Sequence, residues 1–186
     1  WIVRFRPNHG LWALFGDHEM DLHEMASRLT ECALSERLWL RFRAFTGTWP
    51  KIVITCENLG AYIDLPLPPT AMAVFSPGAD IEAAAALLNA LPGAQWVHFG
   101  DIDPDGLEIA ENLGRGTGRT VQFYVPSFAE EYLPGRPTET PWKGIPDRSI
   151  FHQLKRTHKR IFQEVFMLDG RLSDDLLAMT NSYGMP

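Results

Sequence analysis

Short apolar runs alternate with helical patterns between residues 52 and 125, and this order restricts the fold more than any other feature of the sequence. Strands are predicted at 52–56, 71–75, 96–99 and 121–125. Helices are predicted between them at 58–63, 81–91 (with Asp80 as its N-cap) and 104–113. Strands and helices that alternate at this spacing indicate βαβ units. We therefore expect an α/β fold with a central, mostly parallel sheet of about four strands flanked by helices.

The segments on either side of this series are expected to pack against it. Residues 1–49 contain two apolar runs predicted to be strands, 1–5 and 11–15, and a helical pattern from Leu22 to Ala33. Residues 126–147 are rich in proline and glycine and predict a surface loop. We expect three parts: an N-terminal segment at 1–49, a core at 50–147, and a C-terminal helical extension at 148–186.

The C-terminal extension is predicted to contain two helices. Apolar positions spaced along 149–168 predict one long helix, and Ser173 is placed to cap a last helix that runs through Met179. The first residue, Trp1, already lies in an apolar stretch, so we interpret the chain as part of a longer polypeptide.

Composition excludes several classes of protein. Hydrophobic residues make up 45% of the 186 residues, as in globular domains and unlike disordered chains. No apolar run approaches the roughly 20 residues of a membrane-spanning helix, so we expect a cytoplasmic protein without membrane contact. Cys32 and Cys56 lie in apolar segments and predict buried thiols. The net charge of −6 comes from the middle of the chain, where residues 51–144 carry five basic and twelve acidic side chains.

Three carboxylates at alternate positions follow the strand predicted at 96–99. They are Asp101, Asp103 and Asp105, with Gly106 directly after them. Side chains two apart on a strand point the same way, so Asp101 and Asp103 can converge on one hard cation. Open α/β sheets bind ligands at this carboxyl edge, and oxygen ligands suit Mg²⁺ (or Mn²⁺). Helix capping is the competing explanation, because Asp103 precedes Pro104, but capping accounts for neither Asp101 nor Gly100.

Two other acidic motifs partly match these residues. An EF-hand loop begins D-x-D-x-D-G, but its twelfth position, normally glutamate, is Asn112 here, and the preceding segment is a predicted strand. Phosphatases of the haloacid dehalogenase type also use D-x-D, usually with Thr or Val where this chain has Asp105. The calcium interpretation fails on both grounds, and the phosphatase interpretation stays open.

A glutamate ends the strand predicted at 52–56. Glu57 follows Cys56 directly, and a carboxylate at the end of a parallel strand is well placed for acid/base chemistry or metal binding. Such a residue alone is typical of a solvated loop. The functional interpretation of Glu57 depends on the aspartate cluster, which follows another predicted strand about 44 residues later.

A strand-end glutamate followed by a strand-end D-x-D resembles the Toprim domain of topoisomerases, primases and related nucleases. The amino-acid sequence around these acidic residues is similar to the C-terminal Toprim domain of the JetD family. Members of this family are the nuclease subunits of Wadjet anti-plasmid systems and resemble the A subunit of topoisomerase VI. The similar segments, within about residues 50–168, are 56–59 (CENL), 74–78 (VFSPG) and 99–107 (FGDIDPDGL). Gln163-Glu164 resembles a further Q-E element, whereas Ser76-Pro77-Gly78 departs from the expected glycine-richer turn.

The resemblance implies a Toprim-like Rossmannoid fold and a metal-dependent DNA endonuclease. It implies Glu57 as general acid/base and Asp101 and Asp103 as ligands of Mg²⁺ (or Mn²⁺). We expect Asp105 as an additional ligand, with Asn58 and Glu164 in support. The implied partners are DNA, SMC-like subunits of the Wadjet complex, and a second copy of the chain in a homodimer.

A basic stripe is predicted on the outer face of the long helix. Lys155 and Lys159, and likewise Arg156 and Arg160, are four residues apart and would share that face. Such a stripe is typical of solvated surface, and beside a DNA-cleaving site it can also contact phosphates.

Two alternatives to hydrolysis remain open. A transesterase of the topoisomerase VI type needs a tyrosine nucleophile, and the tyrosines here are Tyr62, Tyr124, Tyr132 and Tyr183. None precedes the strand at 52–56, and Tyr62 is expected to pack inside, so water-driven cleavage is favoured. The other alternative is a non-catalytic Toprim scaffold module.

Overall fold

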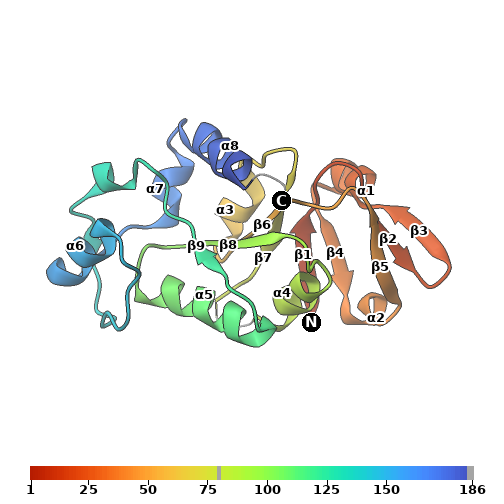
Figure 1. Cartoon of the computed structure of the whole chain (residues 1–186), viewed down its shortest axis with the longest axis horizontal. Helices are drawn as coiled ribbons and strands as arrows, with labels where there is room; N and C mark the ends of the chain where they lie inside the picture. The colour runs from red at the N-terminus through yellow and green to blue at the C-terminus, as the bar shows by residue number, and fades with distance from the viewer. Residues whose placement is uncertain (79–80, 184–186) are drawn as a thin grey trace.

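The computed structural model describes residues 1–78 and 81–183, and in this part of the chain a six-stranded sheet forms the centre of the molecule (Figure 1). Its strand order is β4-β1-β7-β6-β8-β9. The strands β6 (Ile52–Cys56), β7 (Ala71–Phe75), β8 (Gln95–Phe99) and β9 (Gln122–Phe123) are parallel. This confirms the predicted α/β fold with a mostly parallel central sheet. The last strand is shorter than the predicted 121–125.

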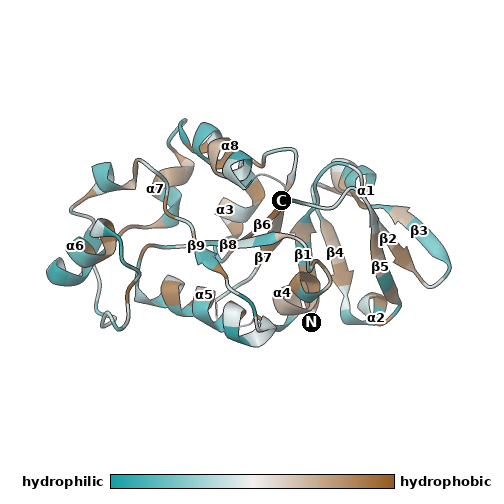
Figure 2. Cartoon of the chain, viewed as in Figure 1, coloured by the Kyte–Doolittle hydropathy of each residue, from teal (hydrophilic) through white to brown (hydrophobic). Residues whose placement is uncertain are grey.

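Two strands of the N-terminal segment extend this sheet. β1 (Ile2–Arg6) pairs antiparallel with β7 on one side and with β4 (Cys32–Ser35) on the other. The rest of the segment forms a small antiparallel sheet of β2 (Leu11–Phe15), β3 (His18–Asp21) and β5 (Phe42–Gly47), with α2 at Glu36–Trp39. Figure 2 shows β3 as mainly polar, as expected for an exposed edge.

The two faces of the parallel strands bury different side chains. Ile52, Ile54 and Cys56 face one apolar layer, whereas Val53 between them faces the other, as the two-residue period of a strand dictates. The first layer is covered by α3 (Leu59–Asp64) and the C-terminal helices, and the second by α4 (Glu82–Asn89) and α5 (Pro104–Thr117). Helices on both faces explain why these strands are apolar at nearly every position. The predicted cap Asp80 lies outside the described residues.

The predicted N-terminal helix is shorter than its apolar pattern. α1 (Leu22–Leu29) begins at Asp21, whose side chain accepts a hydrogen bond from Glu24 N at 2.9 Å. It ends because Thr30 adopts a left-handed conformation with φ 70°. The extension of this helix to Ala33 is therefore wrong, since Ala33 lies in β4 and pairs with Arg4 of β1.

The single long helix predicted for 149–168 is also wrong. The helix α6 (Ser149–Thr157) ends at His158, which is left-handed with φ 51°. The next residues form β11 (Lys159–Arg160), which pairs with β10 (Arg136–Pro137), and a second helix, α7, occupies Gln163–Met167. The chain is extended here because its backbone bonds to the 136–137 segment and, through Ile161, to Ile102. The predicted four-residue pairs of basic side chains along one helix therefore do not form.

The remaining C-terminal elements agree with the sequence in kind. The 126–147 segment is largely irregular, apart from β10 and a short 3₁₀ helix at Ala129–Tyr132. The last helix, α8 (Leu172–Ser182), begins one residue before Ser173, and Ser173 is not its cap. Both cysteines are buried and free, as expected. Among the described residues, no helix combines the length and apolar character that crossing a bilayer requires.

Candidate functional site

The carboxyl ends of β6 and β8 lie side by side and bring the predicted acidic residues together. Cys56 and Phe99, the last residues of these strands, are partners in the parallel register. A cavity of about 270 Å³ opens at this edge, as open α/β sheets favour. Its lining residues are Glu57, Asn58, Gly78, Asp101, Asp103, Asp105 and Arg160.

Asp101 is held between two neighbouring elements. Its backbone N–H donates to Glu57 Oε1 at 2.9 Å, and its Oδ1 accepts from Gln163 N, at the start of α7, at 2.8 Å. The buried Gln163 side chain in turn donates to Phe99 O at 2.9 Å. The sequence distinguishes Gln163-Glu164 only as a pair that resembles a Q-E element, and this resemblance does not predict that Gln163 bonds to Asp101.

Asp103 both caps a helix and lines the cavity. Its Oδ1 accepts from Gly106 N at 2.8 Å, so it is the N-cap of α5 with Pro104 at the first helical position, as the capping interpretation predicts. Its Oδ2 lies 3.5 Å from Arg160 Nη1. The prediction that strand geometry aligns Asp101 with Asp103 is wrong, because β8 ends at Phe99. A turn, with Asp103 N donating to Asp101 O at 2.9 Å, brings them to the same cavity instead.

Two glycines are required by close approach. A Cβ on Gly106 would lie 2.3 Å from Asp101 O, so only glycine lets the start of α5 approach the Asp101 backbone. A Cβ on Gly100 would lie 2.6 Å from His98 Nε2 and 2.8 Å from Glu57 Oε1. Gly100 therefore leaves space for the Glu57 carboxyl group. This explains the glycine at position 100, for which capping of α5 gives no reason.

Burial shifts the acidic groups toward their protonated forms. Mainly through burial, and also through the negative charge of Asp101 and its neighbours, the pKa of Glu57 is raised to about 7. The hydrogen bond from Asp101 N opposes this rise. Burial likewise raises the pKa of Asp101 to about 6 and raises the pKa of Asp103. The arrangement is costly for three ionised carboxylates and favours a bound proton or cation.

The donor set suits a hydrated magnesium ion. Carboxylate oxygens are the ligands that Mg²⁺ prefers, and the ion is typically held through one or two carboxylates while it keeps several waters. In residues 1–78 and 81–183, no three acidic, histidine or cysteine side chains converge tightly enough to form a ready-made metal cage. The carboxylates of Glu57, Asp101 and Asp103 and the guanidinium of Arg160 line one cavity, so these oxygens are the candidate ligands of a hydrated ion.

The other predicted residues have mixed positions. Asn58 caps α3 by accepting from Ala61 N at 3.1 Å, and its amide donates to Glu164 Oε1, so the structure joins these two side chains. Asp105 is exposed and accepts from Thr140 Oγ1 at 3.2 Å. Arg160 lines the cavity, whereas Lys155, Arg156 and Lys159 do not.

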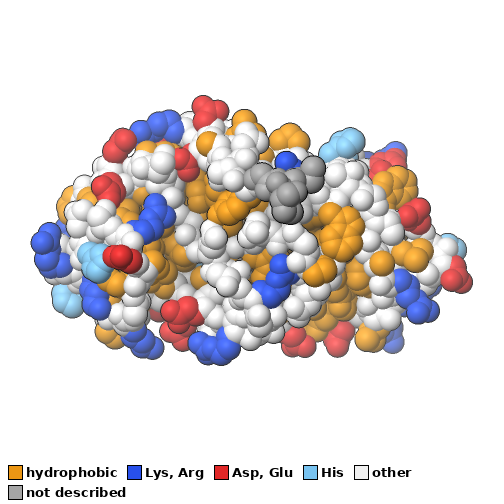
Figure 3. Space-filling model, viewed as in Figure 1, with side chains coloured by type: hydrophobic (Ala, Val, Ile, Leu, Met, Phe, Trp, Pro, Cys, Tyr) orange, Lys and Arg blue, Asp and Glu red, His pale blue; other side chains and the backbone are white. Residues whose placement is uncertain are grey.

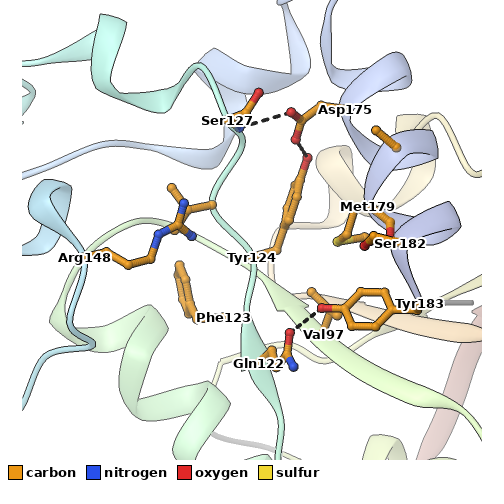
Figure 4. A pocket seen from close by; sticks show the side chains of 12 residues that line it. Val97, Gln122, Phe123, Tyr124, Ser127, Arg148, Asp175, Met179, Ser182 and Tyr183 are labelled. Carbon is orange, nitrogen blue, oxygen red and sulfur yellow. Dashed lines mark hydrogen bonds between the residues drawn. The ribbon is translucent and has the colours of Figure 1, made fainter.

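The tyrosine hydroxyls are engaged elsewhere. A second cavity, of about 360 Å³, lies beside β9 and α8, where Tyr124 donates to Asp175 and Tyr183 to Gln122 (Figure 4). Tyr62 donates to Glu31 at 2.8 Å, which agrees with its expected packing role, and Tyr132 donates to Asp169 at 2.8 Å. None of the four tyrosines lines the acidic cavity.

A comparison with protein families identifies the chain. The family described as "Wadjet protein JetD, C-terminal" matches residues 16–123, which is 108 of the 186 residues. The matched part contains Glu57 and the three aspartates of the cavity and ends before Arg160. No curated protein matches the chain significantly. Because the match covers more than half of the sequence, the chain belongs to the family of the C-terminal part of the Wadjet protein JetD.

Proposed function

We propose that this chain is a metal-dependent DNA endonuclease module that acts in Wadjet anti-plasmid defence. Membership in the JetD C-terminal family supports the role in defence. The observation that carries the nuclease assignment is the contact between two adjacent strand ends, where Asp101 N donates to Glu57 Oε1 within a cavity also lined by Asp103. In our proposal the fold is of the Toprim type.

Asp101 and Asp103 are the residues that would hold Mg²⁺ or Mn²⁺, with Asp105 at the rim. The ion would neutralise charge on the phosphodiester and favour ionisation of the attacking water. The hydrogen bonds from Gln163 N to Asp101 and from Gly106 N to Asp103 fix one oxygen of each carboxylate. The other oxygen of Asp103, Oδ2, lies 3.5 Å from Arg160 Nη1, so a bound ion would share it with that guanidinium.

Glu57 is suited to move a proton at neutral pH. General acid/base catalysis is most efficient when the pKa of the group lies near the working pH, and burial brings that of Glu57 to about 7. The Asp101 N–H fixes Oε1, which leaves Oε2 to exchange the proton with water or with the leaving oxygen. Asn58, tied to Glu164, supports the backbone directly after Glu57.

DNA contacts are proposed at Arg160, which lines the cavity, and at Lys155, Arg156 and Lys159, which do not. Figure 3 shows several Lys and Arg side chains at the end of the molecule where α6 lies. Because the whole chain has a net charge of −6, we propose that SMC-like Wadjet subunits deliver the DNA. A homodimer would place one site on each strand of the duplex.

Hydrolysis is favoured over transesterification within this chain. All four tyrosine hydroxyls donate hydrogen bonds outside the acidic cavity, whereas a tyrosine nucleophile must reach the phosphate held there. A covalent protein–DNA adduct, trapped by denaturation during cleavage, would contradict hydrolysis.

The nuclease proposal is tested by nicking of supercoiled plasmid DNA with Mg²⁺ or Mn²⁺. Glu57→Gln should slow cleavage by about 100-fold or more, because it removes the proton-transfer group. The matched control is Glu24→Gln, which changes an exposed glutamate of α1 paired with Arg28 and should leave the rate unchanged. Equal rates for wild type and Glu57→Gln would reject the assignment.

A further inference from the structure

A smaller cavity shares the residue Arg160 with the acidic cavity. We call it the second hollow, and it is distinct from the cavity beside β9 and α8. It has a volume of about 220 Å³, and its lining includes Tyr132, Arg136, Arg160 and Phe162. Arg160 also lines the acidic cavity, where its Nη1 lies 3.5 Å from Asp103 Oδ2. Among the described residues, Arg160 is therefore the one lining residue that the two cavities have in common.

Two arginines of the second hollow oppose one another on neighbouring strands. Arg136 of β10 and Arg160 of β11 are direct partners in the antiparallel register. Side chains at such positions lie about 5 Å apart at Cβ, and like charges there are destabilising. The exposed Arg136 guanidinium makes no ion pair or hydrogen bond with any described residue. The described lining of the second hollow contains these two arginines and no carboxylate, so the hollow itself suits an anion.

Arg160 also has an aromatic neighbour that holds its plane in place. Its guanidinium carbon lies 4.3 Å from the centre of the Phe162 ring, and its Nε is buried without a hydrogen-bond partner. A guanidinium held between a ring and a carboxylate presents its remaining N–H groups in a fixed direction, the geometry that phosphate recognition uses. The half-buried Phe162 adds an apolar surface to the same hollow.

We propose that this second hollow binds the nucleotide next to the phosphodiester held in the acidic cavity. In this arrangement Arg160 contacts the phosphate between the two hollows, Arg136 contacts the following phosphate, and Phe162 packs against the sugar or base. Alternating phosphates and flat rings are the pattern of a single nucleic-acid strand, and proteins bind such strands with cations and aromatic platforms. The inference rests on the proposed nuclease function and extends it to the path of the strand.

The test measures binding of a fluorescently labelled single-stranded oligodeoxynucleotide to the 186-residue chain by anisotropy, in EDTA and in Ca²⁺, over a series of salt concentrations. Arg136→Ala should weaken binding about tenfold and reduce the slope of log affinity against log salt by about 0.7, as expected for one lost phosphate contact. Phe162→Leu should weaken binding at least fivefold with the slope unchanged, because the loss is of stacking.

The matched control is Arg28→Ala, which removes an exposed arginine of α1, at the opposite end of the molecule from α6 (Figure 1). Equal binding by Arg136→Ala and Arg28→Ala, or no binding by the wild type, would overturn the proposed subsite. Arg136→Glu provides a second variant, and its binding should be weaker than that of Arg136→Ala. Deoxynucleoside monophosphate that competes as well as the oligodeoxynucleotide would also overturn it, since it would indicate a free-nucleotide site.

The two proposals fail separately. If the wild type nicks plasmid but the two Arg136 variants bind DNA normally, the nuclease assignment stands and the subsite is rejected. If the two Arg136 variants lose binding but the wild type does not cleave DNA with any divalent metal, the subsite stands as a nucleic-acid site and the nuclease assignment is rejected.

Discussion

Glu57 shows at the residue scale how a common side chain acquires a specific chemical role. A glutamate after a strand is usually solvated, and here the neighbouring strand end supplies an N–H donor, a glycine without a side chain, and further carboxylates. Sequence spacing predicts that Glu57 and the aspartates share an edge of the sheet. The raised pKa depends on burial by elements distant in the chain, and sequence spacing carries no information about it.

This raised pKa makes stability depend on pH. The pKa of Glu57 rises from 4.5 to about 7 on folding, so the folded state binds the proton more tightly than the unfolded state. The stabilisation that comes from this bound proton is fully present below about pH 4.5 and is lost as the pH rises through about 7. Glu57→Gln cannot ionise, and in urea unfolding it should be more stable than wild type at pH 8 by on the order of 1 kcal/mol, allowing for solvent screening.

At pH 4.5 the two proteins should unfold at similar urea concentrations, and Glu24→Gln should follow wild type at both pH values. Mg²⁺ should stabilise the wild type at pH 8, because a cation that binds only the folded carboxylates adds stability by mass action. It should do less for Asp101→Asn. A Glu57→Gln protein less stable than wild type at pH 8 would contradict the proposed burial of charge.

At the scale of elements, local patterns predict the helices and strands of the parallel sheet and fail where distant pairing decides. The strands at 52–56 and 71–75 have the predicted bounds. The segment 149–168 contains no glycine or proline, and its apolar positions, such as Leu154 and Ile161, fit one helix. Pairing of β11 with β10, and of Ile161 with Ile102, makes residues 159–161 extended, and neither partner can be recognised from helical spacing.

The break between α6 and β11 can be tested at His158. A left-handed residue other than glycine carries a steric cost of about 1 kcal/mol, which glycine avoids. His158→Gly should therefore leave stability unchanged or raise it by about 0.5–1 kcal/mol in chemical denaturation, because φ is 51° at this position. In a continuous helix the same change would cost about 1 kcal/mol.

The matched control is Gln153→Gly, within α6, which should destabilise the protein by about 1 kcal/mol. If His158→Gly destabilises the protein as much as Gln153→Gly does, the chain continues as a helix through 158. The placement of Arg160 beside Asp103 would then be wrong as well.

At the scale of the whole molecule, residues 1–49 are structurally joined to the part that carries the site. β1 covers the edge of β7, and its Val3 and Phe5 belong to the same apolar layer as Val53 and Met72. Arg4 forms a bidentate pair with Glu31, which also accepts a hydrogen bond from the Tyr62 hydroxyl of α3. Sequence analysis predicts the strand at 1–5 but not its partner, because β1 and β7 are about 70 residues apart and antiparallel pairing leaves no local signal.

A chain that begins at Pro50 is therefore expected not to fold stably, although the sequence places its core at 50–147. Without β1 the β7 edge exposes unpaired N–H and C=O groups, and the apolar layer loses Val3 and Phe5. Phe5→Ala in the full chain should already cost about 3–5 kcal/mol of unfolding free energy. Circular dichroism melts should show a cooperative transition with a lowered midpoint for Phe5→Ala and no cooperative transition for the truncated chain. A cooperative melt of the truncated chain at the wild-type temperature would instead establish residues 50–186 as an independent unit and make the N-terminal strands dispensable for the carboxylate cavity.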